Sequence, residues 1–378
     1  MAAEDLTQRA VDVLPDGGLD AKLKLGRPLR VKLGVDPTSP DIHLGFGFVL
    51  ERLAEFQRAG HVVVLIVGDY TARIGDPSGR SAERPVLADD VLDANAARFA
   101  EQAYRILDPE RTETRLNGEW LGGLSYADVV RLTRTMTVAR LLERDDFAKR
   151  FAAHAPISLS ELLYPMMQAY DSVAIEADVE IGGTDQLYNL LAGRDVMQHY
   201  GLEPQVVITY PLLVGGDGDE KMSKSRGNYI GITDPPQEMF GKTMSIPDRA
   251  LPQWWTMLVG GADRPDDPME WKLELARRIT RRWHGDGGAR AGEEHFTRVV
   301  RRHEAPEDVP EVTVRDDRVH LPALLTDRFG HSTSHWRRVV DQGGVKVDGG
   351  PVSDYDVAAR DGMLVQAGKR LFVRLRTG

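Results

Sequence analysis

Two lysines three positions apart, Lys221 and Lys224, form the cluster of this chain that is most suggestive of chemistry. They belong to the string KMSKS at residues 221–225, which follows the glycine-rich residues 214–218. A mobile loop of this kind can close two ammonium groups on a polyphosphate and stabilise charge as it moves to a leaving group. An exposed lysine loop is the ordinary alternative, but the full string in this setting favours phosphate chemistry.

A second cluster, residues 34–45, follows a predicted strand and opens a predicted helix. A helix N-terminus offers unpaired backbone N–H groups and the positive end of the helix dipole, which suits an anion. Thr38 and His43 can add side-chain donors, and Gly45 lets a flat ligand approach the backbone closely. A single histidine after a turn is more often a capping residue, so this cluster alone leaves both interpretations open.

The elements that must position these clusters alternate between strands and helices. The strands are predicted at residues 29–35, 61–68 and 205–210, the second being a continuous apolar run typical of a strand buried on both faces. Residues 48–59 and 89–107 have helical spacing. This alternation predicts a doubly wound, parallel α/β sheet, which binds ligands beyond the carboxyl ends of its strands.

Charge divides the rest of the chain. Residues 271–303 carry nine Lys and Arg against four Asp and Glu, and residues 318–378 carry ten against six. Residues 304–317 carry six acids, one Arg and two prolines, which is typical of a linker. The predicted domains are a Rossmann-like α/β domain at 1–232 that includes the lysine loop, an α-helical domain at 233–303, the linker at 304–317, and a small α+β module at 318–378.

The composition excludes several classes of protein. Among the 378 residues, 42% are hydrophobic and 28% charged, which argues against disorder and fibrous scaffolds. The chain lacks cysteine, so disulfides, thiolate nucleophiles and Cys-ligated metals are excluded. No apolar run is long enough for a transmembrane helix and no signal peptide is recognisable, so we expect a cytoplasmic protein without a membrane partner. The net charge of −10 disfavours binding of nucleic acid by the chain as a whole, but the two basic segments, 271–303 and 318–378, could still bind it.

These clusters resemble the signatures of class I aminoacyl-tRNA synthetases. His43-Leu44-Gly45 is similar to the HIGH signature of that family, and residues 221–225 match its KMSKS signature letter for letter. Three further strings resemble bacterial tyrosyl-tRNA synthetases, and residues 318–378 resemble an RNA-binding module shared with a ribosomal small-subunit protein. The three strings are residues 74–80 (IGDPSGR), 164–171 (YPMMQAYD) and 182–186 (GGTDQ).

The resemblance implies a tyrosine–tRNA ligase. Such an enzyme activates L-tyrosine with ATP to tyrosyl-adenylate and pyrophosphate, and then transfers the tyrosyl group to the 3′ end of tRNA(Tyr). The substrate carboxylate is the nucleophile, so positioning and electrostatics carry the rate. The resemblance also implies Mg²⁺ with ATP, no dedicated metal cage in the protein, and a homodimer; the apolar helices between residues 124 and 151 are the candidate interface.

The resemblance also implies roles for individual residues. The catalytic donors and cations are Thr38, His43, Lys221 and Lys224. The tyrosine site comprises Lys32, Asp36, Thr71, Asp76, Tyr164, Gln168, Asp171 and Gln186, with Asp171 accepting the phenol hydrogen bond. The ATP site comprises Gly45, Phe46, Gly183, Asp185, Met222, Ser223 and Ser225. The residues that meet RNA phosphates are Arg337, Arg338, Lys346, Lys369 and Arg370.

Three positions depart from the family pattern. Phe46 stands where the family usually has His, so a hydrogen bond worth about 0.5–1.5 kcal/mol is missing and activation slows by up to about tenfold. Lys32 stands where many members have a tyrosine that assists at the phenol. In the tail, His335 and Trp336 stand where related modules carry an acid and a small residue.

These departures keep other hypotheses open. One is a diverged copy that activates an unusual aromatic amino acid or serves as a resistant or atypical duplicate. Another is a non-catalytic RNA-binding or regulatory relative, which the intact loop lysines, Thr38 and His43 disfavour. A tryptophanyl-tRNA synthetase is the nearest sibling, and the basic C-terminal module together with Asp171 disfavours it.

Overall fold

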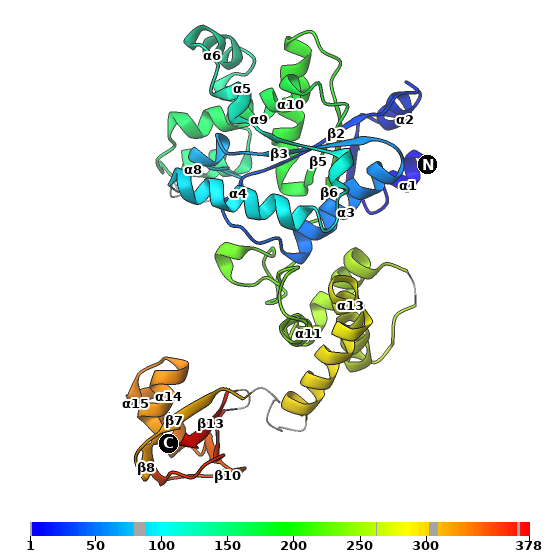
Figure 1. Cartoon of the computed structure of the whole chain (residues 1–378). Coiled ribbons are helices and arrows are strands. Elements are labelled where there is room, and N and C mark those ends of the chain that lie inside the picture. The colour runs from blue at the N-terminus through cyan, green and yellow to red at the C-terminus, as the bar shows by residue number, and fades with distance from the viewer. Residues whose placement is uncertain (1, 79–87, 262, 302–308, 369–370) are drawn as a thin grey trace. The chain divides into compact units, whose positions relative to one another are not determined.

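The computed structural model describes residues 2–78, 88–261, 263–301, 309–368 and 371–378. The chain packs as two compact units (Figure 1). The first comprises Met1–Asp234 and Ser245–Lys272, and the second comprises Pro235–Met244 and Leu273–Gly378. Residues 245–272, which the sequence groups with the helical domain, therefore pack with the α/β unit.

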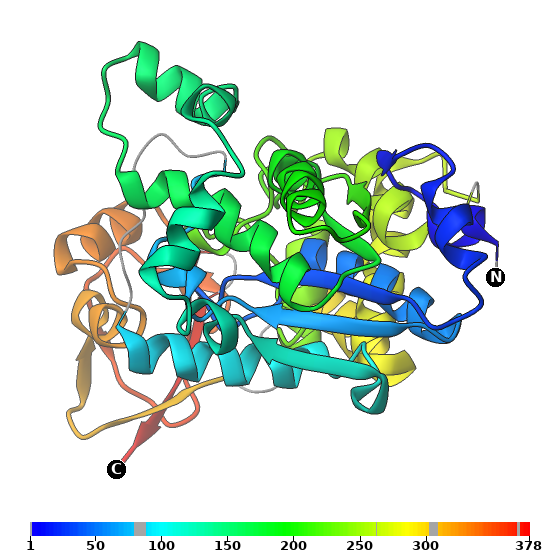
Figure 2. The ribbon, with the colours of Figure 1, turned by 90° about the horizontal axis from the view of Figure 1, so that it is seen from above.

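A six-stranded sheet forms the centre of the first unit. Its strand order is β1-β6-β5-β2-β3-β4, and every neighbouring pair is parallel except β1 with β6. In Figure 2 the strands β2, β3 and β4 lie side by side in blue to teal. The predicted doubly wound sheet is confirmed. The strands are β1 (Asp12–Leu14), β2 (Arg30–Val35), β3 (Val62–Val67), β4 (Thr112–Leu116), β5 (Val179–Gly183) and β6 (Val206–Tyr210).

Helices cover both faces of this sheet. Figure 1 shows α3 (Leu44–Arg58) and α4 (Asp89–Ala103) on one side, and α9 (Leu159–Ala174) and α10 (Leu187–His199) on the other. The apolar strand β3 is buried along nearly its whole length, as expected for a strand covered on both faces. Helix α3 starts four residues before the predicted helix, since His43 caps it by accepting a hydrogen bond from the Phe46 N–H.

Among the described residues, no helix is long and apolar enough to cross a membrane.

Shorter helices complete the first unit. The shorter helices are α1 (Ala3–Leu6), α2 (Gly18–Leu23), α5 (Gly118–Leu121), α6 (Tyr126–Thr133), α7 (Val138–Leu141), α8 (Asp145–Ala152) and α12 (Leu251–Trp254), with 3₁₀ turns at η1 (Thr71–Arg73), η3 (Thr184–Gln186), η4 (Lys224–Arg226) and η5 (Asp248–Ala250).

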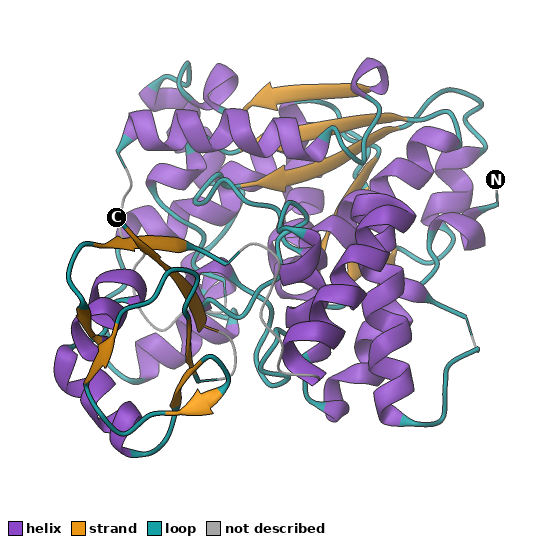
Figure 3. Ribbon diagram, turned by 60° about the horizontal axis from the view of Figure 1, so that its bottom comes forward, coloured by secondary structure: helices purple, strands orange, loops and turns teal. Residues whose placement is uncertain are grey.

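The second unit contains a helical part and the C-terminal module. The helical part consists of α11 (Pro236–Met244) and the portion of α13 (Pro268–Phe296) after Lys272, with non-helical backbone at Gly285 (φ 67°). The module combines short strands, orange in Figure 3, with two helices, purple in Figure 3. The helices are α14 (Leu321–Phe329) and α15 (Thr333–Asp341). The strands are β7 (Glu311–Val314), β8 (Arg318–His320), β9 (Val345–Val347), β10 (Gly350–Pro351), β11 (Asp356–Ala358), β12 (Leu364–Ala367) and β13 (Leu371–Thr377).

Trp336 belongs to the core of the C-terminal module. Its side chain is buried with Leu325, Val340 and Val365, and its indole N–H donates to the Gly330 carbonyl oxygen at 2.8 Å. The unusual aromatic residue at this position therefore has a packing role, because it fills the space between α15 and the module's sheet.

Candidate active site

A cavity of about 640 Å³ opens at the carboxyl ends of the parallel strands. Strands β2, β3 and β5 end at its wall, so residues that follow each strand meet there, as the sheet topology predicts. Helix α9 adds Tyr164, Gln168 and Asp171, whose spacing of four and three residues places them on one helix face. The cavity is thus built from segments far apart in the sequence.

Nearly all the predicted active-site residues line this single cavity. Lys32 is the exception, and the structure places it behind the wall. The predicted residues that line the cavity are Asp36, Thr38, His43, Gly45, Phe46, Thr71, Asp76, Tyr164, Gln168, Asp171, Gly183, Asp185, Gln186, Lys221, Met222, Ser223, Lys224 and Ser225.

Asp171 forms a buried acceptor at one end of the cavity. Its carboxylate accepts hydrogen bonds from the Trp120 indole N–H at 2.8 Å and from the Asn117 amide at 3.3 Å. Burial raises the pKa of Asp171 to about 7, although Lys32, Trp120 and Asn117 act in the opposite direction. This carboxyl is therefore held close to its titration point by an apolar environment and two donors.

Lys32 is fully buried behind Asp171 and is not part of the cavity surface. Its ammonium lies 2.8 Å from Glu180 Oε1 and donates to Ser172 Oγ at 2.8 Å and to the Gln168 carbonyl oxygen at 2.9 Å. All three donors of the ammonium thus have acceptors within the protein. Lys32 therefore supports residues of the cavity wall in this structure. Its direct contact with a ligand stays a prediction.

A second group of acceptors lies around Asp36. Its carboxylate accepts hydrogen bonds from Thr71 Oγ1 at 2.8 Å and from the Tyr164 hydroxyl at 3.0 Å. Gly68 permits this arrangement, because a Cβ there would lie 2.2 Å from Thr71 Oγ1 and 2.3 Å from Asp36 Oδ1. Burial, and next the charge of Asp36, raise the pKa of Tyr164 well above its usual value, so its hydroxyl stays protonated.

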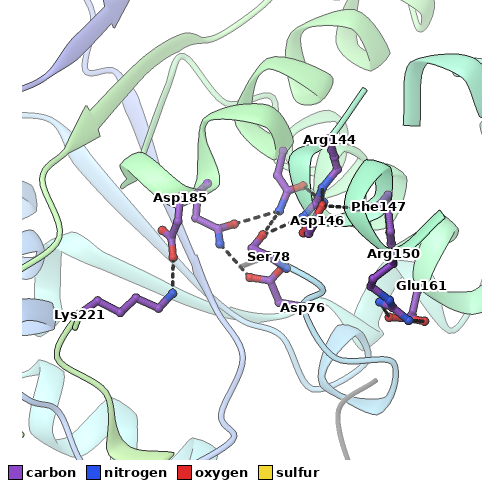
Figure 4. A network of polar contacts seen from close by, with 11 residues as sticks. Asp76, Ser78, Arg144, Asp146, Phe147, Arg150, Glu161, Asp185 and Lys221 are labelled. Atoms are coloured by element: carbon purple, nitrogen blue, oxygen red, sulfur yellow. Dashed lines mark hydrogen bonds and ion pairs between the residues drawn. The ribbon is translucent and has the colours of Figure 1, made fainter. Parts of the chain in front are cut away.

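Asp76 supplies a further carboxylate on the same wall. It accepts the Ser78 backbone N–H at 2.9 Å and the Gln186 amide at 2.7 Å, which fixes the orientation of both of its oxygens. Figure 4 shows this carboxylate within a larger polar network. Asp36 and Asp76 together make this part of the cavity suitable for a cationic group such as an ammonium.

The helix N-terminus of α3 forms another part of the wall. Burial, followed by the charges of Lys224 and Lys221, lowers the pKa of His43 to about 3, so the imidazole is neutral at pH 7. Its Nδ1 accepts the Phe46 N–H at 3.2 Å, which leaves Nε2 as the protonated, donating nitrogen. The Phe46 ring packs edge-on against Phe99, with ring centroids 5.3 Å apart.

The loop lysines bind protein acceptors in this structure. Lys221 Nζ lies 2.6 Å from Asp185 Oδ2, and Lys224 Nζ donates to the carbonyl oxygens of Ser39 and Asp41 at 3.1 and 2.5 Å. The Lys224 ammonium therefore already points at the segment before α3, and the Lys221 ammonium points at η3, after β5. A polyphosphate can take over the contacts of Lys224, because its charged oxygens are stronger acceptors than carbonyl oxygens, and it can compete with the Asp185 carboxylate for Lys221.

The predicted RNA-binding residues lie in the C-terminal module. Arg337 and Arg338 are exposed on α15, and Lys346 is exposed on β9. The guanidinium of Arg337 lies 5.7 Å from the Tyr355 ring centroid. Lys369 and Arg370 lie outside the described residues.

The sequence analysis did not identify Asn117, Trp120 and Glu180, although they contact Asp171 or Lys32. Asn117 and Trp120 follow β4, a largely polar, half-buried edge strand that was not predicted. Polar residues directly after a parallel strand are the signal that would have found them, once that strand was recognised.

The raised pKa of Asp171 predicts a pH-dependent stability difference. The native state keeps the Asp171 proton up to about pH 7, whereas the unfolded chain releases it near 3.8, so this group destabilises the fold as pH rises through that window. We expect Asp171→Asn to gain stability over the wild type between pH 4 and 7, by on the order of 4 kcal/mol at the upper end. Denaturant unfolding as a function of pH measures the difference.

Glu161→Gln is the control with the opposite sign. Hydrogen bonds from Arg150 lower the pKa of Glu161, so that carboxylate stabilises the fold at neutral pH and loses its contribution as pH falls through its lowered pKa. A stability difference between Asp171→Asn and the wild type that did not change from pH 4 to 7 would contradict the assignment.

Comparisons with known proteins agree with this geometry. A model of the family of class I tRNA synthetases (W and Y) matches residues 24–286. The chain is 47% identical to the tyrosine–tRNA ligases of Moorella thermoacetica and Thermotoga maritima, over 98% and 99% of this chain and 95% and 96% of those proteins.

A solved structure supports the fold. The crystal structure of a C-terminally truncated mitochondrial tyrosyl-tRNA synthetase from Aspergillus nidulans superimposes with a TM-score of 0.61 at 22% identity, and the match covers 78% of this chain and 92% of that one. The sheet, the cavity-lining residues and the near-full-length relatives all agree with the match to the family model. The chain therefore belongs to the family of class I tRNA synthetases (W and Y).

Proposed function

We propose that the chain acts as a tyrosine–tRNA ligase that forms tyrosyl-adenylate in the 640 Å³ cavity and then transfers the tyrosyl group to tRNA(Tyr). One observation carries the proposal: a buried acceptor, two carboxylates and two loop lysines line one cavity in the arrangement that tyrosine and ATP require together. The near-full-length relatives at 47% identity support the same activity.

Tyrosine fits the acidic part of this cavity. Its phenol donates to Asp171, whose second role is to exclude phenylalanine, because a ring without a hydroxyl would leave the buried carboxylate without that partner. Its ammonium meets Asp76, Tyr164 and Gln168. Asp36, Thr71 and Gln186 hold these groups in place through the hydrogen bonds described above.

ATP fits the part of the cavity next to the lysine loop. Thr38 and the Nε2–H of neutral His43 donate to the α-phosphate as the tyrosine carboxylate attacks it. Lys221 and Lys224 exchange their protein acceptors for the β- and γ-phosphates and stabilise the leaving pyrophosphate. Asp185, released by Lys221, and Gly183 then face the ribose, and Gly45 and Phe46 face the rest of the nucleoside.

Mg²⁺ enters this scheme with the phosphates of ATP. The carboxylates of Asp36, Asp76 and Asp185 each have hydrogen-bond donors or a lysine bound to them. Among the described residues, no group of three or more His, Asp or Glu side chains is arranged to hold a metal. A Mg²⁺ ion that accompanies ATP would be held by phosphate oxygens and water, as is usual for Mg²⁺ with a nucleotide.

The hypothesis of a diverged or non-catalytic copy is not favoured. Lys32, one of its two supports, is a buried ion pair with Glu180. Phe46, the other, packs on Phe99 and leaves the catalytic His43 in place. Both departures are thus compatible with the chemistry of the relatives.

Tyrosine-dependent ATP–pyrophosphate exchange without tRNA tests the activation step. We expect exchange with tyrosine and none with phenylalanine or tryptophan. Lys224→Met should lower kcat by about a hundredfold while the KM for tyrosine stays constant, because that ammonium acts on the phosphates. Lys242→Met, in an exposed ion pair of α11, is the matched control and should exchange like the wild type.

Absence of exchange with all three amino acids would contradict the proposal. Phe46→His, assayed in the same way, is expected to raise the rate by up to about tenfold, since it restores a hydrogen-bond donor near the nucleotide.

The chain is proposed to act as a homodimer. Large apolar side chains are exposed on three of the short helices of the first unit and at the start of α9: Tyr126, Val138, Phe151 and Leu159. Such side chains rarely face water without a partner when they recur within one segment. Phe151→Asp with Val138→Asp should convert a dimer to monomers in sedimentation equilibrium. Val91→Asp, also an exposed valine, is the control and should stay dimeric.

tRNA(Tyr) is proposed to bind the basic segment 270–303 and the C-terminal module. The double variant Arg337→Glu/Arg338→Glu should weaken tRNA binding. It should also reduce the slope of log K against log salt by about 1–2, because binding with fewer phosphate contacts releases fewer counterions. Arg58→Glu, at the end of α3 near the amino ends of the strands, is the control. Unchanged affinity and slope in the double variant would place the tRNA elsewhere.

A further inference from the structure

A buried arginine outside the cavity is connected to the proposed ammonium site. Arg144 precedes α8, its side chain is only 5% exposed, and it is not among the cavity-lining residues. Its guanidinium binds the Asp146 carboxylate at 3.0 and 2.7 Å and lies 5.1 and 5.3 Å from the ring centroids of Phe147 and Tyr188. The ion pair with Asp146, shown in Figure 4, and the two rings fix its position.

The remaining donors of Arg144 begin a chain of hydrogen bonds. Nη1 donates to Asn189 Oδ1 at 2.7 Å, and Nη2 donates to Ser78 Oγ at 3.0 Å. Asn189 Nδ2 donates to Gln186 Oε1 at 3.0 Å, and Gln186 Nε2 donates to Asp76 Oδ2 at 2.7 Å. The chain therefore runs from the guanidinium through two side-chain amides to the Asp76 carboxylate.

The direction of this chain is dictated by its two ends. A guanidinium has donors and no acceptor, so Asn189 must turn its oxygen toward Arg144 and its nitrogen toward Gln186. Gln186 must then turn its oxygen toward Asn189 and its nitrogen toward Asp76. Without the guanidinium, only the Asp76 carboxylate still orders the two amides, and Asn189 can rotate by half a turn. The Asn189 oxygen would then face the Gln186 oxygen, and this repulsion would weaken the hold of Gln186 on Asp76.

We propose that Arg144 is a positioning residue for the amino-acid ammonium, because it sets the orientation of the Asn189 and Gln186 amides and thereby that of Asp76. This inference rests on the proposed function, since it assumes that Asp76 receives the ammonium of tyrosine. It assigns to α8 a specific role in substrate recognition, carried out through two amides and without contact to the substrate.

Arg150, within α8, offers a matched control. Its side chain is also 5% exposed, and it binds the buried Glu161 carboxylate at 2.6 and 2.9 Å. Figure 4 shows this pair beside the network. The described hydrogen bonds do not connect Arg150 to Asp76, so Arg150→Met removes an equally buried ion pair without releasing the amides.

The experiment measures the binding of two ligands to full-length protein. The ligands are tyrosine and 3-(4-hydroxyphenyl)propanoate, which lacks the ammonium. Arg144→Met should weaken tyrosine binding by about tenfold and leave the propanoate unchanged. Arg144→Lys, which keeps the charge and donors, should recover part of the loss. Arg150→Met should keep the wild-type ratio of the two affinities.

Asn189→Asp provides a second test that does not depend on Arg144 being dispensable for folding. It is isosteric and keeps an acceptor for Arg144, but it cannot donate to Gln186, so the same selective loss of tyrosine affinity is expected. The inference is overturned if Arg144→Met and Asn189→Asp keep the wild-type ratio of affinities, or if Arg150→Met changes it equally. A wild-type protein that fails to bind tyrosine would instead overturn the proposed function.

Discussion

Burying a carboxylate in an apolar cavity is the physical constraint on which the rest of this site depends. Asp171 is enclosed by protein, and its charged form is costly there unless donors and a nearby cation compensate. The indole of Trp120 and the amide of Asn117 supply the donors, and Lys32 supplies the cation from behind. Lys32 in turn needs Glu180, so one buried acceptor requires a layer of polar residues beneath it.

The same principle organises the cavity along its length. The carboxylates of Asp36 and Asp76 can hold a cationic group, and the loop that contains Lys221 and Lys224 supplies cationic side chains. His43 in the same cavity stays neutral because it is buried and because Lys224 and Lys221 lie near it. A ligand that is cationic at one end and a polyanion at the other matches this gradient of charge without a large rearrangement of the wall.

The sequence predicted the fold and the cavity-lining residues well because both depend on local signals. Apolar runs identify β2, β3 and β6, and the strings around His43, Asp171 and Lys221 are contiguous in sequence. The partners of these residues could not be predicted in the same way. Trp120 reaches Asp171 only because β4 pairs with β3, and Lys32 meets Glu180 because β2 pairs with β5 in the register that sets these two residues side by side. Such contacts depend on pairing and register, which no single string encodes.

The contacts of the loop lysines have a consequence for how binding energy is used. Lys221 rests on Asp185, and Lys224 rests on two backbone carbonyl oxygens, so neither ammonium needs to lose a full shell of water when a nucleotide arrives. Binding then exchanges one set of acceptors for another, and the net gain in the ground state is small. Acceptor strength rises as negative charge accumulates on the departing pyrophosphate. In the proposed mechanism, the loop therefore interacts more strongly with the transition state than with bound ATP, which would raise turnover more than affinity.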